Sequence, residues 1–143
     1  MTLFSLIARF TALFVVSFIV VTILMIFIIA LLQLPPVIES YISYFLVWVV
    51  SFYVLNQYNE KNLVVMSKNQ RWKVIFSLTI TAVIIGVIFS APVNSDNLPR
   101  DIQSLLMGVL IALPTYTLLI WSAEFRATKR LLKDHPELKN AEN

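Results

Sequence analysis

The chain carries VIFSLTITAVIIGVIFSA at residues 74–91 and IQSLLMGVLIALPTYTLLIWSA at residues 102–123. Each run is almost entirely apolar and has the length of a helix that crosses a bilayer. A polar segment of only ten residues, 92–101, joins the two runs, so they must be neighbours in space. We therefore predict an antiparallel transmembrane hairpin, and the rest of the fold follows from it.

Each run also carries three small residues at four-residue spacing. They are Ala82, Gly86 and Ser90 in the first run and Ser104, Gly108 and Ala112 in the second. On a helix this spacing aligns the small residues into one smooth groove. In lipid, such grooves are where helix backbones approach closely and gain van der Waals contact. We expect the two grooves to pack against each other within the hairpin; the alternative is an interface between two copies of the chain.

The composition favours lipid as the solvent along the whole chain. Hydrophobic residues make up 59% and charged residues 13%, and the mean hydropathy is +0.82. A soluble domain has about half its residues apolar and a quarter charged. Two further apolar stretches, about 10–32 and 37–56, have the length of spans. The predicted fold class is all-α: an integral membrane four-helix bundle formed by a single domain, residues 1–143.

Local signals mark where the helices begin and end. Pro35 and Pro36 end the first span and begin the second, because proline disrupts a helix interior but fits the first turn of a helix. Ser67 and Gln70 have the spacing of a capping box, which predicts that the third helix begins just before Trp72.

Pro114 removes one backbone hydrogen bond, to the carbonyl of Leu110, and is expected to kink the fourth span. The hydroxyls of Thr115, Tyr116 and Thr117 can satisfy the freed backbone groups. The kink is either a hinge or ligand notch, or a fixed bend that wraps the helix around its neighbours; we favour the fixed bend.

The distribution of positive charge predicts the orientation. Ten of the eleven lysines and arginines lie in the N-terminal segment, the connection 57–73 and the C-terminal tail, and Arg100 alone lies on the opposite side. Under the positive-inside rule both termini are cytoplasmic. We therefore expect a multi-pass protein of the bacterial inner (cytoplasmic) membrane, with the N-terminus and the C-terminus inside.

Beyond the fourth span the helix is expected to continue as a basic amphipathic tail, about 124–135. Its cations fall on one face, where they predict contact with anionic lipid or a partner; they are Arg126, Lys129, Arg130 and Lys133. The alternative is ordinary charge that only fixes the topology. Phe125, Leu131 and Leu132 lie on the other side of the same segment.

Two acidic residues lie at the predicted membrane boundaries. Glu39, at the outer boundary, is placed to form an ion pair with Arg100 that ties the two outer turns together. Glu124, at the inner boundary, is within reach of solvent and of Arg71 or Lys73. We interpret both as structural boundary charges, because a carboxylate that carries protons normally lies deeper in the membrane.

The expected function follows by elimination among three classes. An enzyme needs a nucleophile with a base, paired carboxylates or metal ligands, and the spans offer no such constellation, so we expect no catalysis, no metal and no cofactor. A small transporter or channel would need several copies. An interaction or accessory protein needs only helix faces and a basic cytoplasmic face. Its partners would be the lipid bilayer and another membrane protein or itself, but not nucleic acid.

In layout the chain resembles the small four-helix inner-membrane proteins of Gram-negative bacteria, a group without a known activity. The resemblance rests on the tight turn at Pro35 and Pro36, the entry Asn69-Gln70-Arg71-Trp72-Lys73 to the third span, and the basic tail after Phe125. Bacterial immunity proteins against pore-forming toxins are similar in size and topology. That second resemblance implies a toxin partner on the periplasmic side or within the lipid.

Overall fold

The computed structural model describes residues 2–33, 37–63, 65–90 and 98–141; within these ranges the side chains at 37–41, 90, 98–101 and 139–141 are not described. The described residues form four α-helices and a short 3-10 helix. Their bounds are α1 Leu3–Leu32, α2 Val37–Asn62, α3 Lys68–Ser90, α4 Leu98–Asp134 and η1 Pro136–Ala141. The all-α, four-helix part of the prediction is confirmed.

The helix ends follow local chemistry. The Thr2 hydroxyl accepts from the Ser5 amide at 3.2 Å, so α1 begins well before the predicted span at residue 10. The predicted capping box is confirmed. The Ser67 amide donates to Gln70 Oε1 at 3.3 Å, and the Gln70 amide donates to Ser67 Oγ at 3.4 Å. With both groups satisfied, α3 begins directly after Ser67.

Two helices extend beyond the apolar runs. α2 reaches Asn62 rather than residue 56, and α4 continues through Pro114 to Asp134, so the tail expected at about 124–135 is helical and continuous with the fourth span. Thr115 Oγ1 donates to the carbonyl of Ile111 and Thr117 Oγ1 donates to that of Leu113, at 2.8 and 2.7 Å. These hydroxyls support the turns beside Pro114, although neither bonds to Leu110, whose carbonyl the proline leaves free.

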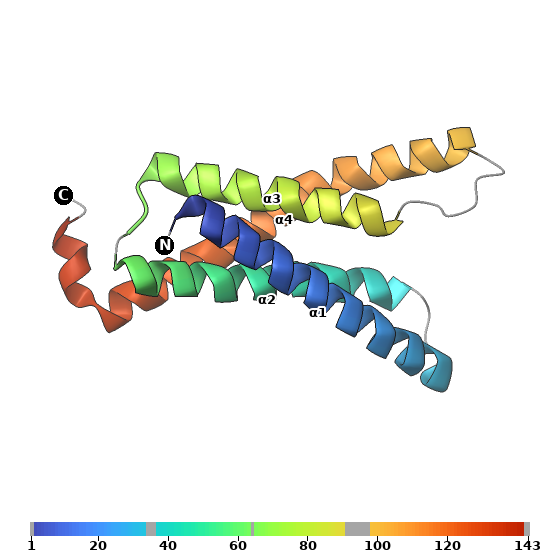
Figure 1. Cartoon of the computed structure of the whole chain (residues 1–143), viewed down its shortest axis with the longest axis horizontal. Helices are drawn as coiled ribbons and strands as arrows, with labels where there is room; N and C mark the ends of the chain where they lie inside the picture. Colours follow the sequence, from blue (N-terminus) through green and yellow to red (C-terminus); the bar gives the residue numbers. More distant parts are fainter. Residues whose placement is uncertain (1, 34–36, 64, 91–97, 142–143) are drawn as a thin grey trace.

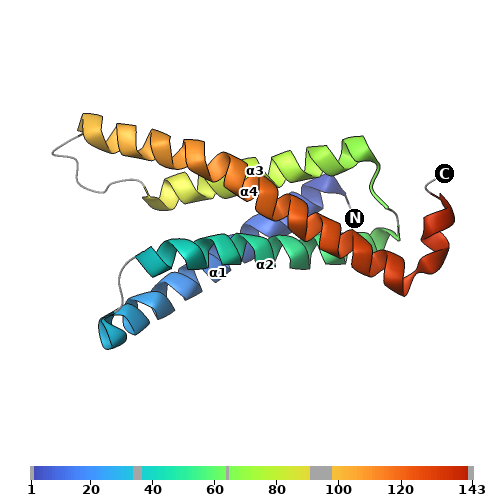
Figure 2. The same cartoon turned by 180° about the vertical axis from the view of Figure 1, so that it is seen from behind.

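The helices are antiparallel to their neighbours in sequence, and both termini lie at the same end of the molecule (Figure 1). We call this the basic end, defined by the N-terminus of α1, the turn between α2 and α3 and the last turns of α4. The opposite end, where α1 ends and α4 begins, is the apolar end. α4 crosses the bundle obliquely and contacts both α3 and α2 (Figure 2).

The core is concentrated toward the basic end. α1 and α3 contribute buried residues mainly from their first halves, whereas α2 and α4 contribute them from about the middle onward. Buried positions recur every three or four residues, as expected for one face of a helix; examples are Leu6, Phe10 and Phe14 in α1, Val47, Val50 and Val54 in α2, Ile75, Leu78 and Ala82 in α3, and Ile120, Ala123 and Ala127 in α4.

Toward the apolar end the α1–α2 hairpin diverges from the α3–α4 hairpin (Figures 1 and 2). The side chains there are largely exposed. They include Ile23, Leu24, Ile26, Phe27, Ile28, Leu31 and Leu32 of α1 and Ile102, Leu106, Met107, Leu110 and Ile111 of α4. Because consecutive residues are exposed, these helices present apolar side chains in almost every direction.

Three helical segments are long and apolar enough to cross a membrane: Leu3–Leu32, Lys68–Phe89 and Ile102–Asp134. The second predicted span is not among them over the residues searched. Its helix, α2, carries Ser51, Gln57 and Asn59 in its second half. α2 also lies between α1 and α4, and it contributes both apolar and polar residues to the buried set.

Candidate functional site

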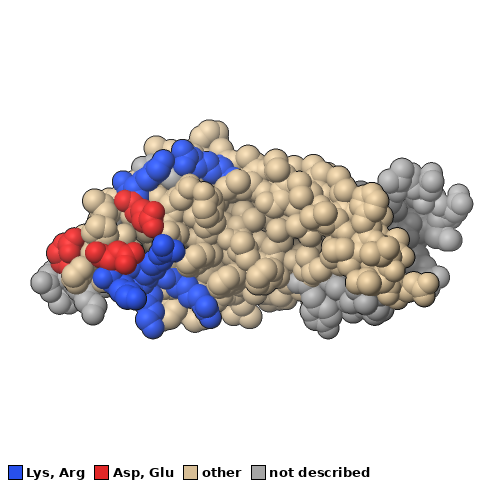
Figure 3. Space-filling view, turned by 90° about the horizontal axis from the view of Figure 1, so that it is seen from below, with Lys and Arg blue, Asp and Glu red and all other residues tan. Residues whose placement is uncertain are grey.

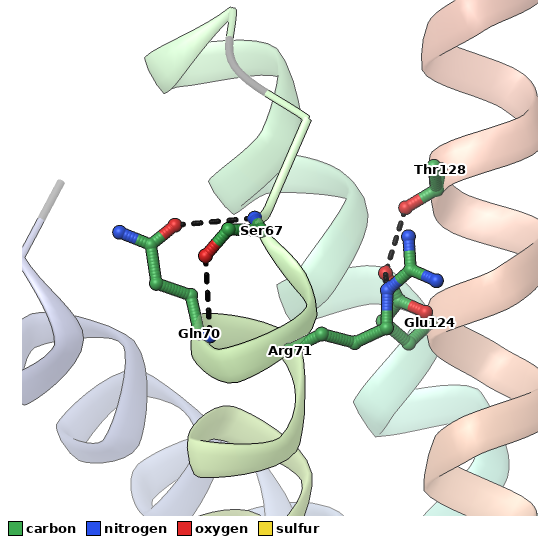
Figure 4. A network of polar contacts seen from close by, with 5 residues as sticks. All are labelled: Ser67, Gln70, Arg71, Glu124 and Thr128. Atoms are coloured by element: carbon green, nitrogen blue, oxygen red, sulfur yellow. Dashed lines mark hydrogen bonds and ion pairs between the residues drawn. The ribbon is translucent and has the colours of Figure 1, made fainter. Parts of the chain in front are cut away.

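The most unusual side chain among the described residues is the carboxylate of Glu124, which is 0% exposed. Its Oε1 accepts a hydrogen bond from Thr128 Oγ1 at 2.8 Å and lies 3.1 Å from Arg71 Nε (Figure 4). The Arg71 side chain is 28% exposed, so the ion pair lies at the edge of the core. A buried charge is tolerated when it is paired and hydrogen-bonded, and Glu124 Oε1 meets both conditions.

Local structure brings these residues together. The Ser67–Gln70 capping box begins α3 so that Arg71, in the first turn, extends toward α4 (Figure 4). On α4, Glu124 and Thr128 are four residues apart and therefore share one face, next to the buried alanines Ala123 and Ala127. We call Arg71, Glu124 and Thr128 the buried polar network.

Several buried polar atoms near this region have no hydrogen-bond partner among the described residues. They are the hydroxyl of Ser51, both amide atoms of Asn59, the second oxygen of Glu124, Oε2, and Arg71 Nε, whose contact with Glu124 Oε1 at 3.1 Å is an ion pair without hydrogen-bond geometry. Ser51 and Asn59 lie eight residues apart, so with Leu55 between them they share one buried face of α2. Unpaired buried polar groups are rare and are commonly satisfied by water or an ion.

The prediction for Glu124 was right about its partner and wrong about its environment. Arg71, one of the two predicted cations, is the one that pairs with it. We predicted a carboxylate within reach of solvent, but the face of α4 that carries Glu124 packs into the core. The sequence did contain a signal for this burial. Small residues mark a packed helix face, and Glu124 shares its face with Ala123, Ala127 and Thr128, which alternate with the cations.

The cations form a belt at the basic end. The exposed cations there are Arg9, Lys61, Lys68, Lys73, Arg126, Lys129, Arg130 and Lys133. A few acidic side chains lie among the cations, and the rest of the described surface in this view is uncharged (Figure 3). The four cations predicted on one face of the tail are therefore all exposed. The predicted opposite face is only partly correct, because Leu131 is buried whereas Phe125 is 57% exposed.

Within the belt, Arg126 makes a specific contact. Its guanidinium carbon lies 5.3 Å from the centre of the Trp48 ring, which is a cation–π distance. Trp48 Nε1 in turn donates to Ser122 Oγ at 2.9 Å, one turn before Arg126 on α4. This contact connects α2 with α4 at the boundary between the belt and the apolar surface.

The C-terminal end of the described chain holds two exposed polar pairs, one within the last turns of α4 and one just beyond it. Arg130 Nε lies 3.8 Å from Asp134 Oδ2, and His135 Nδ1 lies 3.1 Å from Glu137 Oε1. A hydrogen bond from its own backbone amide, and secondly the contact with His135, hold the pKa of Glu137 below its usual range. Exposed pairs of this kind contribute little to stability.

The predicted packing of the two small-residue grooves needs correction. α3 and α4 are neighbours, as expected for the hairpin. However, a Cβ atom added at Gly86 or at Gly108 would meet nothing within 4 Å, so neither glycine marks a close approach of backbones. Ala82 is buried and Gly86 and Ala112 are half-buried, whereas Ser104 and Gly108 are exposed; the side chain of Ser90 is outside the described residues. The two grooves therefore do not meet at their glycines.

The predicted ion pair between Glu39 and Arg100 lies outside the described side chains. Pro114 is in the interior of α4, as predicted, and its side chain is exposed. The described residues contain no group of three or more His, Cys, Asp or Glu side chains that could hold a metal ion.

The fold and the belt define a class: an all-α protein with several helices suited to a membrane and a cationic region at one end. Comparison with known proteins adds nothing to this class, because no family model, curated protein or solved structure matches the chain.

Proposed function

We propose that this chain is a multi-pass protein of the bacterial inner membrane with both termini in the cytoplasm. Three helices have the length and composition of spans, and the chain ends share one end of the bundle. The exposed cations of the described residues gather at that end, which is the cytoplasmic side under the positive-inside rule. α2 would form the fourth span, shielded by α1 and α4.

We further propose a non-catalytic role as an interaction or accessory protein that binds another membrane protein through its helix faces. The observation that carries this proposal is the exposure of α1 and α4 at the apolar end. Gly108 is exposed there, and open space surrounds the position of its missing side chain. A helix from a partner could therefore approach the backbone of α4, which is the geometry that favours association in lipid.

Co-purification tests this role. The tagged protein, solubilised in a mild detergent, should migrate as a complex on a blue-native gel and yield one stoichiometric partner by mass spectrometry. Gly108→Leu should abolish the complex, because the new side chain occupies the space through which a partner helix would approach α4. Phe125→Leu, an exposed substitution near the basic end, should leave the complex intact. A wild-type protein that migrates alone from native membranes would contradict the proposal.

The buried polar network favours one alternative, an oligomeric transporter of a small cation or of protons. A carboxylate inside the bundle with one unpaired oxygen is a typical feature of such carriers. Flux of protons or monovalent cations into proteoliposomes would support transport if Glu124→Gln abolishes it and Glu60→Gln, at an exposed carboxylate of α2, does not. Absence of flux in the wild type would remove this alternative.

A further inference from the structure

The guanidinium of Arg126 contacts an aromatic ring but no acidic side chain among the described residues. Its carbon atom lies 5.3 Å from the Trp48 ring centre. Among the described residues it has no ion pair and no hydrogen bond, in contrast to Arg71 and Arg130, which pair with acids. A guanidinium packed against an aromatic ring keeps its N–H groups at the edge of its plane, where they can bind an anion.

Trp48 is itself held by several contacts, so the ring that Arg126 contacts has a defined position. The indole N–H donates to Ser122 at 2.9 Å. The Trp48 ring stacks on Phe52, with 5.7 Å between ring centres and 5° between planes, and on Phe45 at 6.4 Å and 21°. A binding group that is ordered before its ligand arrives loses less entropy on binding.

The surroundings of Arg126 match one class of ligand. Lys129 and Lys133 are exposed on the same face of α4, three and seven residues further on, and add positive charge toward the basic end. In the other direction lies the exposed ring of Phe45 of α2, 6.4 Å from the Trp48 ring. A ligand at this position would therefore meet cations at one end and apolar surface at the other.

We propose that Arg126, in cation–π contact with Trp48, binds the phosphate group of an anionic phospholipid, with Lys129 and Lys133 adding attraction and the lipid chains lying along the apolar side chains. The guanidinium edge matches phosphate oxygens in two-point geometry, which an ammonium group cannot reproduce. This inference rests on the proposed membrane location and turns the basic face into a site for a defined lipid group.

Native mass spectrometry of the purified full chain can measure the affinity for the first added phosphatidylglycerol or phosphatidylcholine molecule. The site predicts a preference for phosphatidylglycerol that falls at least about tenfold in Arg126→Ala, as expected from the loss of charge-assisted hydrogen bonds. Arg126→Lys should lose most of the preference although the charge is kept. Trp48→Leu should lose it as well, provided that its circular dichroism remains helical.

Lys133→Ala is the matched control, because it removes a cation from the same face and leaves the contact between Arg126 and Trp48 unchanged. One charge near headgroups predicts at most about a fivefold loss. If Arg126→Lys binds like the wild type, or if Arg126→Ala matches Lys133→Ala, the attraction is diffuse and the proposal is overturned.

Glycerol 3-phosphate and inorganic phosphate, added without lipid, distinguish the two sources of phosphate. Tight binding of either that depends on Arg126 would assign the site to a soluble anion and overturn the lipid assignment. Failure to find a protein partner would leave these measurements unaffected, whereas absence of the protein from the membrane fraction would remove the proposed location itself.

Discussion

At the scale of single residues, the ion pair of Arg71 with Glu124 leads to a test of stability. Arg71→Met keeps the length of the side chain but leaves a buried carboxylate without its counter-charge. Breaking a buried pair in this way costs about 3–5 kcal/mol, and the partial exposure of Arg71 places the expected loss near about 3 kcal/mol. Denaturant unfolding in micelles measures it.

The double variant Arg71→Met with Glu124→Gln is the control for that measurement. It removes both charges, so it should be more stable than Arg71→Met alone, because no unpaired carboxylate remains in the core. If instead the stability losses of Arg71→Met and of Glu124→Gln simply add in the double variant, the two residues do not interact and the pairing in the structure is wrong.

The tail offers a titration with a defined sign. The pKa of Glu137 lies below its usual range mainly through the bond from its own amide, and only secondly through His135. Its charged form therefore favours the folded turn at pH values above the usual Glu pKa, and this support is lost as the pH falls through the lowered pKa. In His135→Ala we expect the pKa of Glu137, followed by NMR, to stay below normal; a return to the normal value would contradict this.

For single residues, the sequence predicted interaction partners more accurately than it predicted which side chains are buried. The charges of α4 could be placed on one face from their spacing, and Arg71 could be named as a partner of Glu124 from the proximity of the two boundaries. The burial of Glu124 could not be derived in the same way, because hydropathy averages over a window and does not show which face of α4 meets α2 and α3.

At the scale of helices, the Ser67 cap determines where α3 begins and thus where Arg71 lies. Ser67→Ala should cost about 1 kcal/mol, the usual value for a lost N-cap. Ser77→Ala is the matched control, because Ser77 lies inside α3 and its hydroxyl donates only to the Lys73 carbonyl at 2.7 Å. Hydrogen exchange of the amides of residues 69–71 should rise in the first variant alone; an equal rise in both would exclude a capping role.

The small residues of α3 and α4 give a second test at this scale. Gly108→Leu should leave the single chain folded, because open space surrounds the added side chain. Ala82→Leu, at a fully buried position, should destabilise the fold by about 1–3 kcal/mol through overpacking. Unfolding in detergent compares the two variants. Unfolding of Gly108→Leu would restore the originally predicted groove-to-groove packing.

Helix types and order were predictable from the sequence, and the capping box located the start of α3. The full length of α2 was not, because this helix continues past its apolar window to Asn62, whereas the extension of α4 to Asp134 matches the amphipathic tail expected at about 124–135. The groove packing failed for a related reason: four-residue spacing shows that a smooth face exists, but not that another helix meets it, and the space beside both glycines is open.

At the scale of the whole molecule, the concentration of the core at the basic end explains why the two ends differ. Four helices pack around shared apolar residues near the termini, and the hairpins separate beyond them. In water such an apolar end would be an aggregation hazard, since exposed patches of this extent mark interfaces or membranes. In a bilayer the same surface would contact lipid chains, so a membrane location is consistent with the loose helix packing at the apolar end.

The proposed orientation of the chain in the membrane yields the last prediction, and the absence of cysteine from the sequence makes it simple to measure. Single cysteines in place of the exposed Lys61 and Lys133 should react with a membrane-impermeant maleimide only after the inner membrane is opened. Asp96→Cys, in the connection between α3 and α4, should react in cells whose outer membrane alone is permeable. The physical reason is the free-energy cost of moving lysines and arginines across the bilayer. This cost keeps the cationic belt inside, and the connection that carries Asp96 does not contain the belt. If Lys61→Cys and Asp96→Cys react from the same side, α3 does not cross the membrane, and the proposed arrangement of spans is wrong.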